Sequence, residues 1–181
     1  MNIPRSIRNL VLGGFMGSGK SSVGRLVAAQ LRFRYVDTDE LIEQRAGKTI
    51  TQIFTENGEP FFRELEAQVV AELAQYENAV ISTGGGMTAN EANLASLKQH
   101  ALVICLWASP ETIWERVRHQ SHRPLLRDPD PLEKIRKLLT ARAPFYKQAD
   151  ALVISEGRSV KEVAQHVIHQ FHLARRQVTS P

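Results

Sequence analysis

A glycine-rich stretch at residues 14–21 constrains the fold of this chain more than any other feature. It reads GFMGSGKS and fits the pattern G-x-x-x-x-G-K-[ST]. Residues 9–12 before it form a short apolar run that predicts a buried strand, and the apolar residues after it recur at helical spacing. Because a glycine-rich turn between a strand and a helix points backbone N–H groups into one concavity, the stretch predicts a polyphosphate site.

Two side chains of this stretch have defined tasks when the pattern binds a nucleotide. Lys20 is predicted to reach the β- and γ-phosphates, and the Ser21 hydroxyl is predicted to coordinate Mg²⁺. A chance glycine turn is the alternative reading. The strand before the pattern and the helix predicted from about Lys20 disfavour that alternative, so we expect the chain to bind a nucleoside triphosphate.

Length and composition narrow the class of protein. A chain of 181 residues suits one domain, expected over residues 1–181, and its 43% hydrophobic content is that of a globular protein. The net charge of +4 is too small to favour nucleic acid, and no apolar run approaches the roughly 18 residues of a membrane span. The single Cys105 lies in an apolar run and excludes disulfides within the chain, which fits the cytoplasm.

Apolar runs and helical periodicities alternate along the rest of the chain. Further strands are predicted at residues 33–36, 79–82, 101–107 and 151–154, each followed by a helical segment. Five such alternations predict an α/β fold in three layers, α/β/α, with a parallel sheet covered by helices on both faces. In such sheets ligands bind at the carboxyl ends of the strands.

Two distinctive clusters follow predicted strands. Asp37 and Asp39 come directly after one strand, where two carboxylates can serve Mg²⁺ and orient a substrate hydroxyl. The alternative is that both only cap the next helix, although a cap needs one aspartate. The three glycines at residues 84–86 form either a flexible turn or bare backbone that a ligand approaches, and their cost in chain entropy favours the second interpretation.

Charged side chains also fall on apolar helix faces. Glu66 lies on the apolar stripe of the helix predicted after Pro60, where a carboxylate needs a partner, and Arg63 is three residues away. The two could form a buried structural ion pair, or Glu66 could hold an arginine fork for a substrate carboxylate. Arg142 lies on the apolar stripe of a later helix and either extends to the surface or completes a carboxylate clamp.

Two further segments lack apolar periodicity. The segment at about residues 119–130 is polar and broken by proline, which predicts a mobile lid or loop. Arg123 and Arg127 in it are either solvated charges or groups that a closing lid brings onto the transferring phosphoryl group. The tail from about residue 174 is expected to fray.

Together these motifs resemble the shikimate kinase family, and the resemblance spans nearly the whole chain. The first motif, G-x-x-G-x-G-K-S, is shared by many nucleotide-binding families, whereas the full ordered set is specific. The set continues with D-T-D at residues 37–39, F-R-x-x-E at 62–66, G-G-G at 84–86, R-P-L-L at 123–126 and R-x-P-x-Y at 142–146.

The resemblance implies a P-loop kinase with a five-stranded parallel sheet. Such an enzyme transfers a phosphoryl group from ATP to the 3-hydroxyl of shikimate, a step of aromatic amino-acid biosynthesis through chorismate. It also implies catalytic roles for Lys20, Asp39 and Arg123, and a Mg²⁺ site at Ser21 supported by Asp37. The residues implied to bind phosphate are Gly17, Ser18, Gly19, Lys20, Ser21, Ser22 and Arg123, and those implied to bind shikimate are Asp39, Arg63, Gly84, Gly85, Gly86 and Arg142.

Contacts to the adenine are less well defined. Arg116 is a candidate stacking partner, and residues 156–158 with Arg158 could close the other side. We expect a monomer whose partners are small molecules. A P-loop kinase for gluconate or a nucleoside monophosphate remains an alternative, although it gives no reason for the D-T-D, F-R-x-x-E and glycine motifs together. A non-enzymatic nucleotide-binding module also remains, although it would not need two inward-facing arginines.

Overall fold

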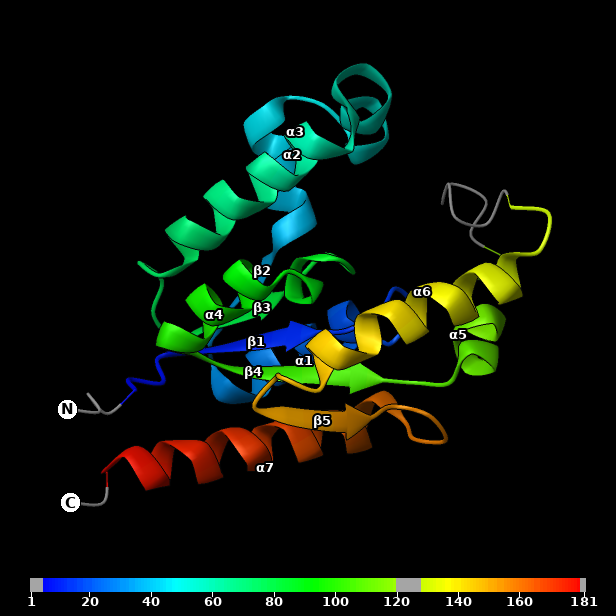
Figure 1. Ribbon diagram of the computed structural model, residues 1–181. Coiled ribbons are helices and arrows are strands. Elements are labelled where there is room, and N and C mark those ends of the chain that lie inside the picture. Colours follow the sequence, from blue (N-terminus) through cyan, green and yellow to red (C-terminus); the bar gives the residue numbers. More distant parts are fainter. Residues whose placement is uncertain (1–4, 120–127, 180–181) are drawn as a thin grey trace.

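The computed structural model describes residues 5–119 and 128–179, and a five-stranded parallel sheet forms its centre (Figure 1). The strands lie in the order β2-β3-β1-β4-β5, and each pairing is parallel, which confirms the prediction. The strands span Asn9–Gly13 (β1), Arg34–Asp37 (β2), Ala79–Ser82 (β3), Ala101–Trp107 (β4) and Ala151–Ile154 (β5).

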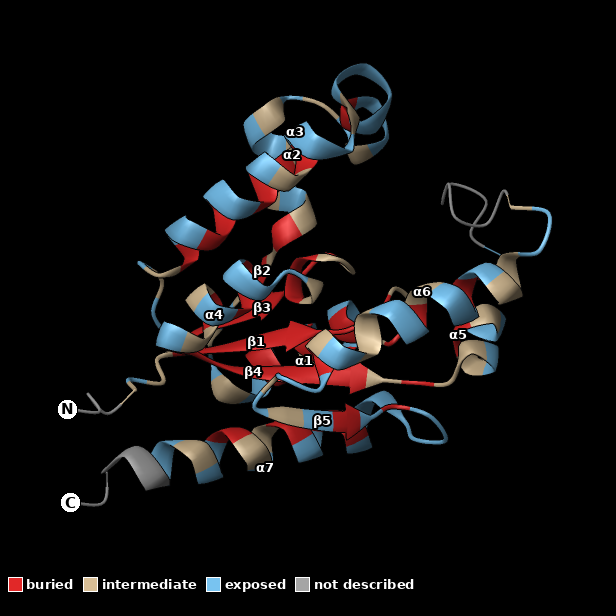
Figure 2. Ribbon diagram, in the orientation of Figure 1, coloured by how far each residue is buried: buried red, intermediate tan, exposed pale blue. Residues whose placement is uncertain are grey.

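Helices cover both faces of the sheet, so the arrangement has the three predicted layers (Figure 2). Leu10 and Leu12 of β1 face a core shared with α1 and α7, whereas Val11 faces a core shared with α3 and α4, because successive strand residues point to opposite faces. No helix in the described part of the chain is long and apolar enough to cross a membrane. The helices span Lys20–Leu31 (α1), Thr38–Ala46 (α2), Ile50–Leu73 (α3), Glu91–His100 (α4), Pro110–Val117 (α5), Pro131–Tyr146 (α6) and Val160–Thr179 (α7), with a 3-10 turn at Met87–Ala89 (η1).

A third core packs α5 and α6 against the loop that follows β1. Phe15 of this loop is buried there together with Ile113 of α5 and Leu139 of α6. Cys105 is buried in the same core, as predicted, and burial raises the pKa of its thiol to about 11. The thiol therefore stays protonated at neutral pH and serves as a small apolar side chain.

α2 and the first part of α3 rise away from the carboxyl end of the sheet (Figure 1). α3 is kinked at Gly58, whose φ of 81° and ψ of 173° are not helical. Pro60 follows two residues later and begins the second part. The helix predicted after Pro60 is thus the second part of a kinked helix, and it carries Arg63 and Glu66 toward the sheet.

The tail is more regular than the sequence predicted. We expected fraying from about residue 174, but α7 continues to Thr179. The apolar stripe of α7 extends one turn beyond Phe171, to Ala174. Phe171 is fully buried and packs edge-on against Phe33 with ring centroids 5.7 Å apart, and Ala174 packs against the same core.

Replacing Phe171 with alanine tests this docking. The substitution should lower the free energy of unfolding by about 3–5 kcal/mol, because it removes a buried aromatic ring and leaves a cavity between α7 and the sheet. Urea denaturation of both proteins measures the change. Leu173→Ala on the same helix is the matched control, since Leu173 is 40% exposed and its loss should cost far less. Equal losses for the two variants would contradict the docking of α7.

Candidate active site

The phosphate loop lies between β1 and α1, at the carboxyl end of the sheet, as predicted. Gly14, Gly17 and Gly19 have positive φ values of 122°, 74° and 100°. At Gly14 a Cβ atom would also collide with the carbonyl oxygen of Leu106, so only glycine fits there. α1 begins at Lys20 without a side-chain cap at Gly19, and its first-turn N–H groups remain available to an anion.

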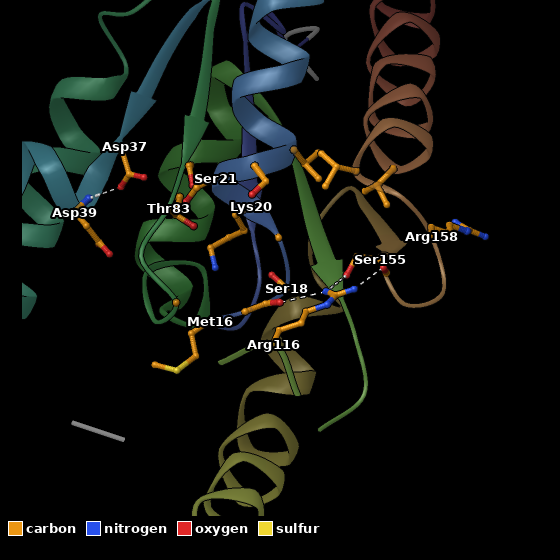
Figure 3. Close-up of a pocket in the computed structure, with 18 of the residues that line it drawn as sticks. Met16, Ser18, Lys20, Ser21, Asp37, Asp39, Thr83, Arg116, Ser155 and Arg158 are labelled. Carbon is orange, nitrogen blue, oxygen red and sulfur yellow. Dashed lines mark hydrogen bonds between the residues drawn. The ribbon is translucent and has the colours of Figure 1, made fainter. Parts of the chain in front are cut away.

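Lys20 is held against the phosphate loop. Its side chain is buried, and Nζ donates hydrogen bonds of 2.9 Å to the carbonyl oxygens of Gly14 and Phe15. These bonds fix the ammonium group at the floor of the loop, where the predicted phosphates would meet it. Ser21 follows in the first turn of α1, with its hydroxyl in the same cavity (Figure 3).

One cavity of about 600 Å³ collects most of the predicted site residues (Figure 3). The phosphate loop and the first turn of α1 form its centre, the ends of β2 and β3 form one side, and α5 with the loop before α7 forms the other. Its volume suits a nucleotide-sized ligand. The predicted residues in its lining are Gly17, Ser18, Gly19, Lys20, Ser21, Ser22, Asp37, Asp39, Gly85, Arg116 and Arg158.

The two aspartates have different surroundings. Asp37 caps α2 through Oδ1, which accepts a hydrogen bond of 3.1 Å from the Asp39 N–H, and its Oδ2 accepts one of 3.0 Å from the Tyr35 hydroxyl. Asp37 therefore caps α2 and also lines the cavity, and its role toward Mg²⁺ stays a prediction. Asp39 instead lies in the first turn of α2 beside Gly84, where an added Cβ would lie 2.6 Å from Asp39 Oδ1.

The glycines at residues 84–86 let several groups approach the backbone closely. A Cβ on Gly84 would meet Asp39, and one on Gly86 would lie 2.8 Å from Arg63 Nη1. A Cβ on Gly85 would lie 3.3 Å from the backbone nitrogen of Met16 in the phosphate loop. The close approach at Gly84 and Gly86 is thus made by the side chains of Asp39 and Arg63, and the approach of a ligand to these glycines stays a prediction.

Arg63 and Glu66 form the ion pair that their spacing predicted. Arg63 Nη1 lies 2.6 Å from Glu66 Oε2, and Glu66 is 1% exposed. Burial raises the pKa of the Glu66 carboxyl above its usual range, and pairing with Arg63 offsets only part of this effect. Arg63 also donates hydrogen bonds to Glu59 Oε1, from Nη2 at 2.7 Å and from Nε at 3.1 Å, and its side chain remains about one-third exposed.

Arg142 reaches the same glycines from α6. Its Nη1 donates a hydrogen bond of 3.1 Å to the Gly85 carbonyl oxygen, and its guanidinium group lies over the Phe15 ring. The Tyr146 hydroxyl, one turn later on α6, donates to the same carbonyl at 2.9 Å. Because burial raises the pKa of Tyr146 to about 12, the phenol remains a hydrogen-bond donor at neutral pH. Arg63 and Arg142 thus meet consecutive glycines, and their charges converge.

Arg116 lines the cavity, whereas Arg63, Gly84, Gly86 and Arg142 are not among its lining residues. Its Nη1 donates to the Gly17 carbonyl at 3.2 Å and to the Ser155 hydroxyl at 3.1 Å, and its Nη2 donates to the Ser155 carbonyl at 2.8 Å (Figure 3). Arg158 is also a lining residue. Both arginines therefore line the cavity that holds the phosphate loop, and their contacts to adenine stay predictions.

The predicted Mg²⁺ ligands fit a magnesium ion chemically. Ser21 and Asp37 supply a hydroxyl and a carboxylate oxygen to the cavity, and Mg²⁺ prefers oxygen ligands and usually keeps several waters. Within residues 5–119 and 128–179, no cluster of three or more His, Cys, Asp or Glu side chains could hold a metal by itself. A site shared with substrate phosphates accords with both observations.

Some contacts at the site were missed in the sequence, and others fall outside the structure. Tyr146 and Arg142 share a helix face at i, i+4 spacing, which could have signalled a joint contact. Glu59 lies four residues before Arg63, and the same i, i+4 spacing could have indicated the contact between them. Arg123 and Arg127 lie outside the described residues, as does most of the predicted lid, and their roles remain predictions.

These features define a class of protein. A glycine-rich loop with a buried lysine, between the first strand and the first helix of a parallel sheet, is a P-loop. Asp39, Arg63 and Arg142 gather around the glycines at residues 84–86 beside it and suit the acceptor of a phosphoryl group, so the class is that of P-loop kinases. The family model described as shikimate kinase matches residues 16–172, and the chain belongs to this family.

Individual relatives agree with this assignment. The chain is 41% identical over 165 residues to the shikimate kinase of Caldanaerobacter subterraneus subsp. tengcongensis, covering 91% of this chain and 96% of the relative. It is 46% identical to that of Symbiobacterium thermophilum, covering 90% and 95%.

Solved structures resemble the chain to different degrees. The shikimate kinase from Acinetobacter baumannii in complex with shikimate has a TM-score of 0.87 and 35% identity, covering 94% of this chain and 96% of that one. A gluconokinase from Sinorhizobium meliloti 1021 has a TM-score of 0.60 and 18% identity, covering 98% and 97%, and shares the fold alone.

Proposed function

We infer that this protein catalyses the ATP-dependent phosphorylation of the 3-hydroxyl of shikimate, a step of aromatic amino-acid biosynthesis through chorismate. One observation carries the inference most directly. Two arginines from different helices converge on the glycines at residues 84–86, beside a carboxylate at Asp39 and next to the phosphate loop. This arrangement has one anchor for a carboxylate, one acceptor for a hydroxyl proton, and a phosphate donor site within reach.

The residues that would bind shikimate, here called the acceptor end, are Asp39, Arg63, Arg142 and the glycines at residues 84–86, and they would act by orienting the substrate. Arg63 and Arg142 would bind the shikimate carboxylate, because paired guanidinium groups match a carboxylate in geometry and charge. Glu66 would hold Arg63 in place through its 2.6 Å contact. Asp39 would accept the hydrogen bond of the 3-hydroxyl and take its proton as the oxygen attacks, while the backbone of Gly84, Gly85 and Gly86 would line the ring.

The donor end would work by charge stabilisation. Lys20 and the N–H groups of residues 17–22 would neutralise the phosphate oxygens, which carry the spreading negative charge of phosphoryl transfer. Ser21, with support from Asp37, would hold Mg²⁺, which would supply positive charge to the phosphate oxygens when bound. Arg123 of the predicted lid would add a further positive charge at the transferred phosphoryl group. Closure of the lid would exclude water and prevent hydrolysis of ATP.

We further propose that residues 1–181 form one catalytic domain that works as a monomer in the cytoplasm. The shared cores on both faces of the sheet and the reduced, buried state of Cys105 support this proposal. Small molecules rather than nucleic acid or membrane would be its partners.

The acceptor preference tests the proposed function. With Mg²⁺ and ATP, ADP release should be stimulated strongly by shikimate and hardly at all by gluconate, AMP or CMP. Shikimate holds its carboxylate and its 3-hydroxyl at a fixed separation on a ring, whereas gluconate carries both groups on a flexible chain and AMP and CMP have no carboxylate for the two arginines to bind. A coupled assay of ADP release with each acceptor and with none measures this. Equal rates with and without shikimate would refute the proposal and favour a nucleotide switch or an ATPase.

A further inference from the structure

The loop of residues 155–159, between β5 and α7, forms the wall of the cavity opposite the acceptor end. Ser155, Arg158 and Ser159 of this loop line the cavity. The first residue of the loop is held in place, because Ser155 is buried and its N–H donates a hydrogen bond of 2.8 Å to the carbonyl oxygen of Trp107 at the end of β4. Beyond Ser155 the chain turns through Gly157, whose φ is 67°, and the backbone has no strand partner there among the described residues.

A single carboxylate fastens this loop to α5. Oε2 of Glu156 accepts a hydrogen bond of 3.0 Å from the Ser109 N–H, and Oε1 accepts bonds of 2.9 Å and 2.8 Å from the hydroxyls of Ser109 and Thr112. These donors, Thr112 first among them, hold the pKa of Glu156 below its usual range, so the carboxylate is ionised at neutral pH. Both of its oxygens are thus engaged with the start of α5.

The far end of α5 engages the same loop and the phosphate loop. Arg116 lies in the last turn of α5 and bonds both to Ser155 and to the Gly17 carbonyl. The loop of residues 155–159 is therefore tied to α5 at two points, by Glu156 at the first turn and by Arg116 at the last. Arg116 thus links the loop of residues 155–159 to the phosphate loop, and both of these segments line the cavity (Figure 3).

We propose that Glu156 is a positioning residue for the nucleotide, and this rests on the proposed function in placing ATP in this cavity. Glu156 holds the loop of residues 155–159 on α5, and it thereby keeps Arg116 and the outer wall in place before the nucleotide arrives. Because the loop is already ordered before the nucleotide binds, the binding free energy is not reduced by the entropy cost of ordering it. Loss of the carboxylate should then weaken nucleotide binding, although Glu156 touches neither the phosphates nor the acceptor.

The test compares nucleotide and acceptor binding in Glu156→Ala. We expect the dissociation constant for ADP, measured by calorimetric titration without shikimate, and the KM for ATP each to rise by about fivefold to twentyfold. The kcat and the KM for shikimate should stay within about twofold, because the acceptor end lies across the cavity. Thr112→Val removes one of the three donors and should shift ADP affinity in the same direction by a smaller factor.

Glu111→Ala is the matched control. Glu111 lies in the first turn of α5 and is an exposed carboxylate whose ion-pair partner at 2.7 Å is Arg136 of α6 rather than a residue of the loop of residues 155–159. Its ADP affinity should equal that of the wild type. Unchanged ADP affinity in Glu156→Ala, or a parallel rise in the KM for shikimate, would overturn the proposal and leave Glu156 a stabilising contact only. Failure of the wild type to phosphorylate shikimate would refute the proposed function, whereas the ratio of ADP affinities decides the role of Glu156 independently.

Discussion

Replacing Asp39 with asparagine should lower kcat by about 10²–10⁴-fold, the range lost when a positioned general base is removed. Asparagine keeps the size of the side chain but cannot take the proton of the acceptor hydroxyl. The variant should remain folded, because asparagine fits beside Gly84 and removes a negative charge near the buried Glu66. Steady-state kinetics with ATP and shikimate, with thermal melting as a check of folding, measure the effect.

The control for Asp39 is its neighbour. Glu40 is largely exposed and pairs with Arg25 at 3.4 Å, so Glu40→Gln should leave kcat near the wild-type value. A folded Asp39→Asn protein with kcat close to that of Glu40→Gln would show that Asp39 neither accepts the proton nor orients the hydroxyl.

Replacing Arg142 with alanine should weaken shikimate binding by about 2–4 kcal/mol, the cost of a lost charged hydrogen-bond pair. At about 1.4 kcal/mol per factor of ten, this corresponds to a dissociation constant raised roughly 30- to 700-fold. ATP binding without shikimate should change little, because Arg142 contacts Gly85 and Phe15 rather than the residues that would hold the nucleotide. Equilibrium titration with each ligand separates the two effects.

Two further variants sharpen the test of Arg142. Arg142→Lys keeps the positive charge but loses the planar fork, so its shikimate affinity should fall between those of the wild type and the alanine variant. Arg136→Ala removes an exposed arginine of the same helix, which pairs with Glu111, and should bind shikimate normally. Normal shikimate binding by a folded Arg142→Ala protein would remove Arg142 from the proposed carboxylate anchor.

Features governed by local sequence were predicted well. The phosphate loop, the start of α1 at Lys20 and the five strands follow from glycine conformation and from the apolar pattern of buried parallel strands. The Arg63–Glu66 pair was predictable for the same reason, because residues three apart share a helix face and a buried carboxylate needs a partner.

Features that depend on tertiary contacts were not predicted. The D-T-D motif does not reveal that Asp37 caps α2 while Asp39 lies against Gly84, since this depends on how β3 and α2 meet. The joint contact of Arg142 and Tyr146 with Gly85 spans more than fifty residues of chain. Ala174 packs against the core beyond Phe171, and its weak apolar character gives little periodic signal in the sequence.

Phosphorus NMR of a reaction containing the protein, Mg²⁺, ATP and shikimate tests the central claim most directly. Phosphoryl transfer to the 3-hydroxyl predicts a new phosphomonoester resonance coupled to the proton on C3 of shikimate, formed in the same amount as ADP. ADP accompanied by inorganic phosphate, with no phosphomonoester of shikimate, would contradict the account.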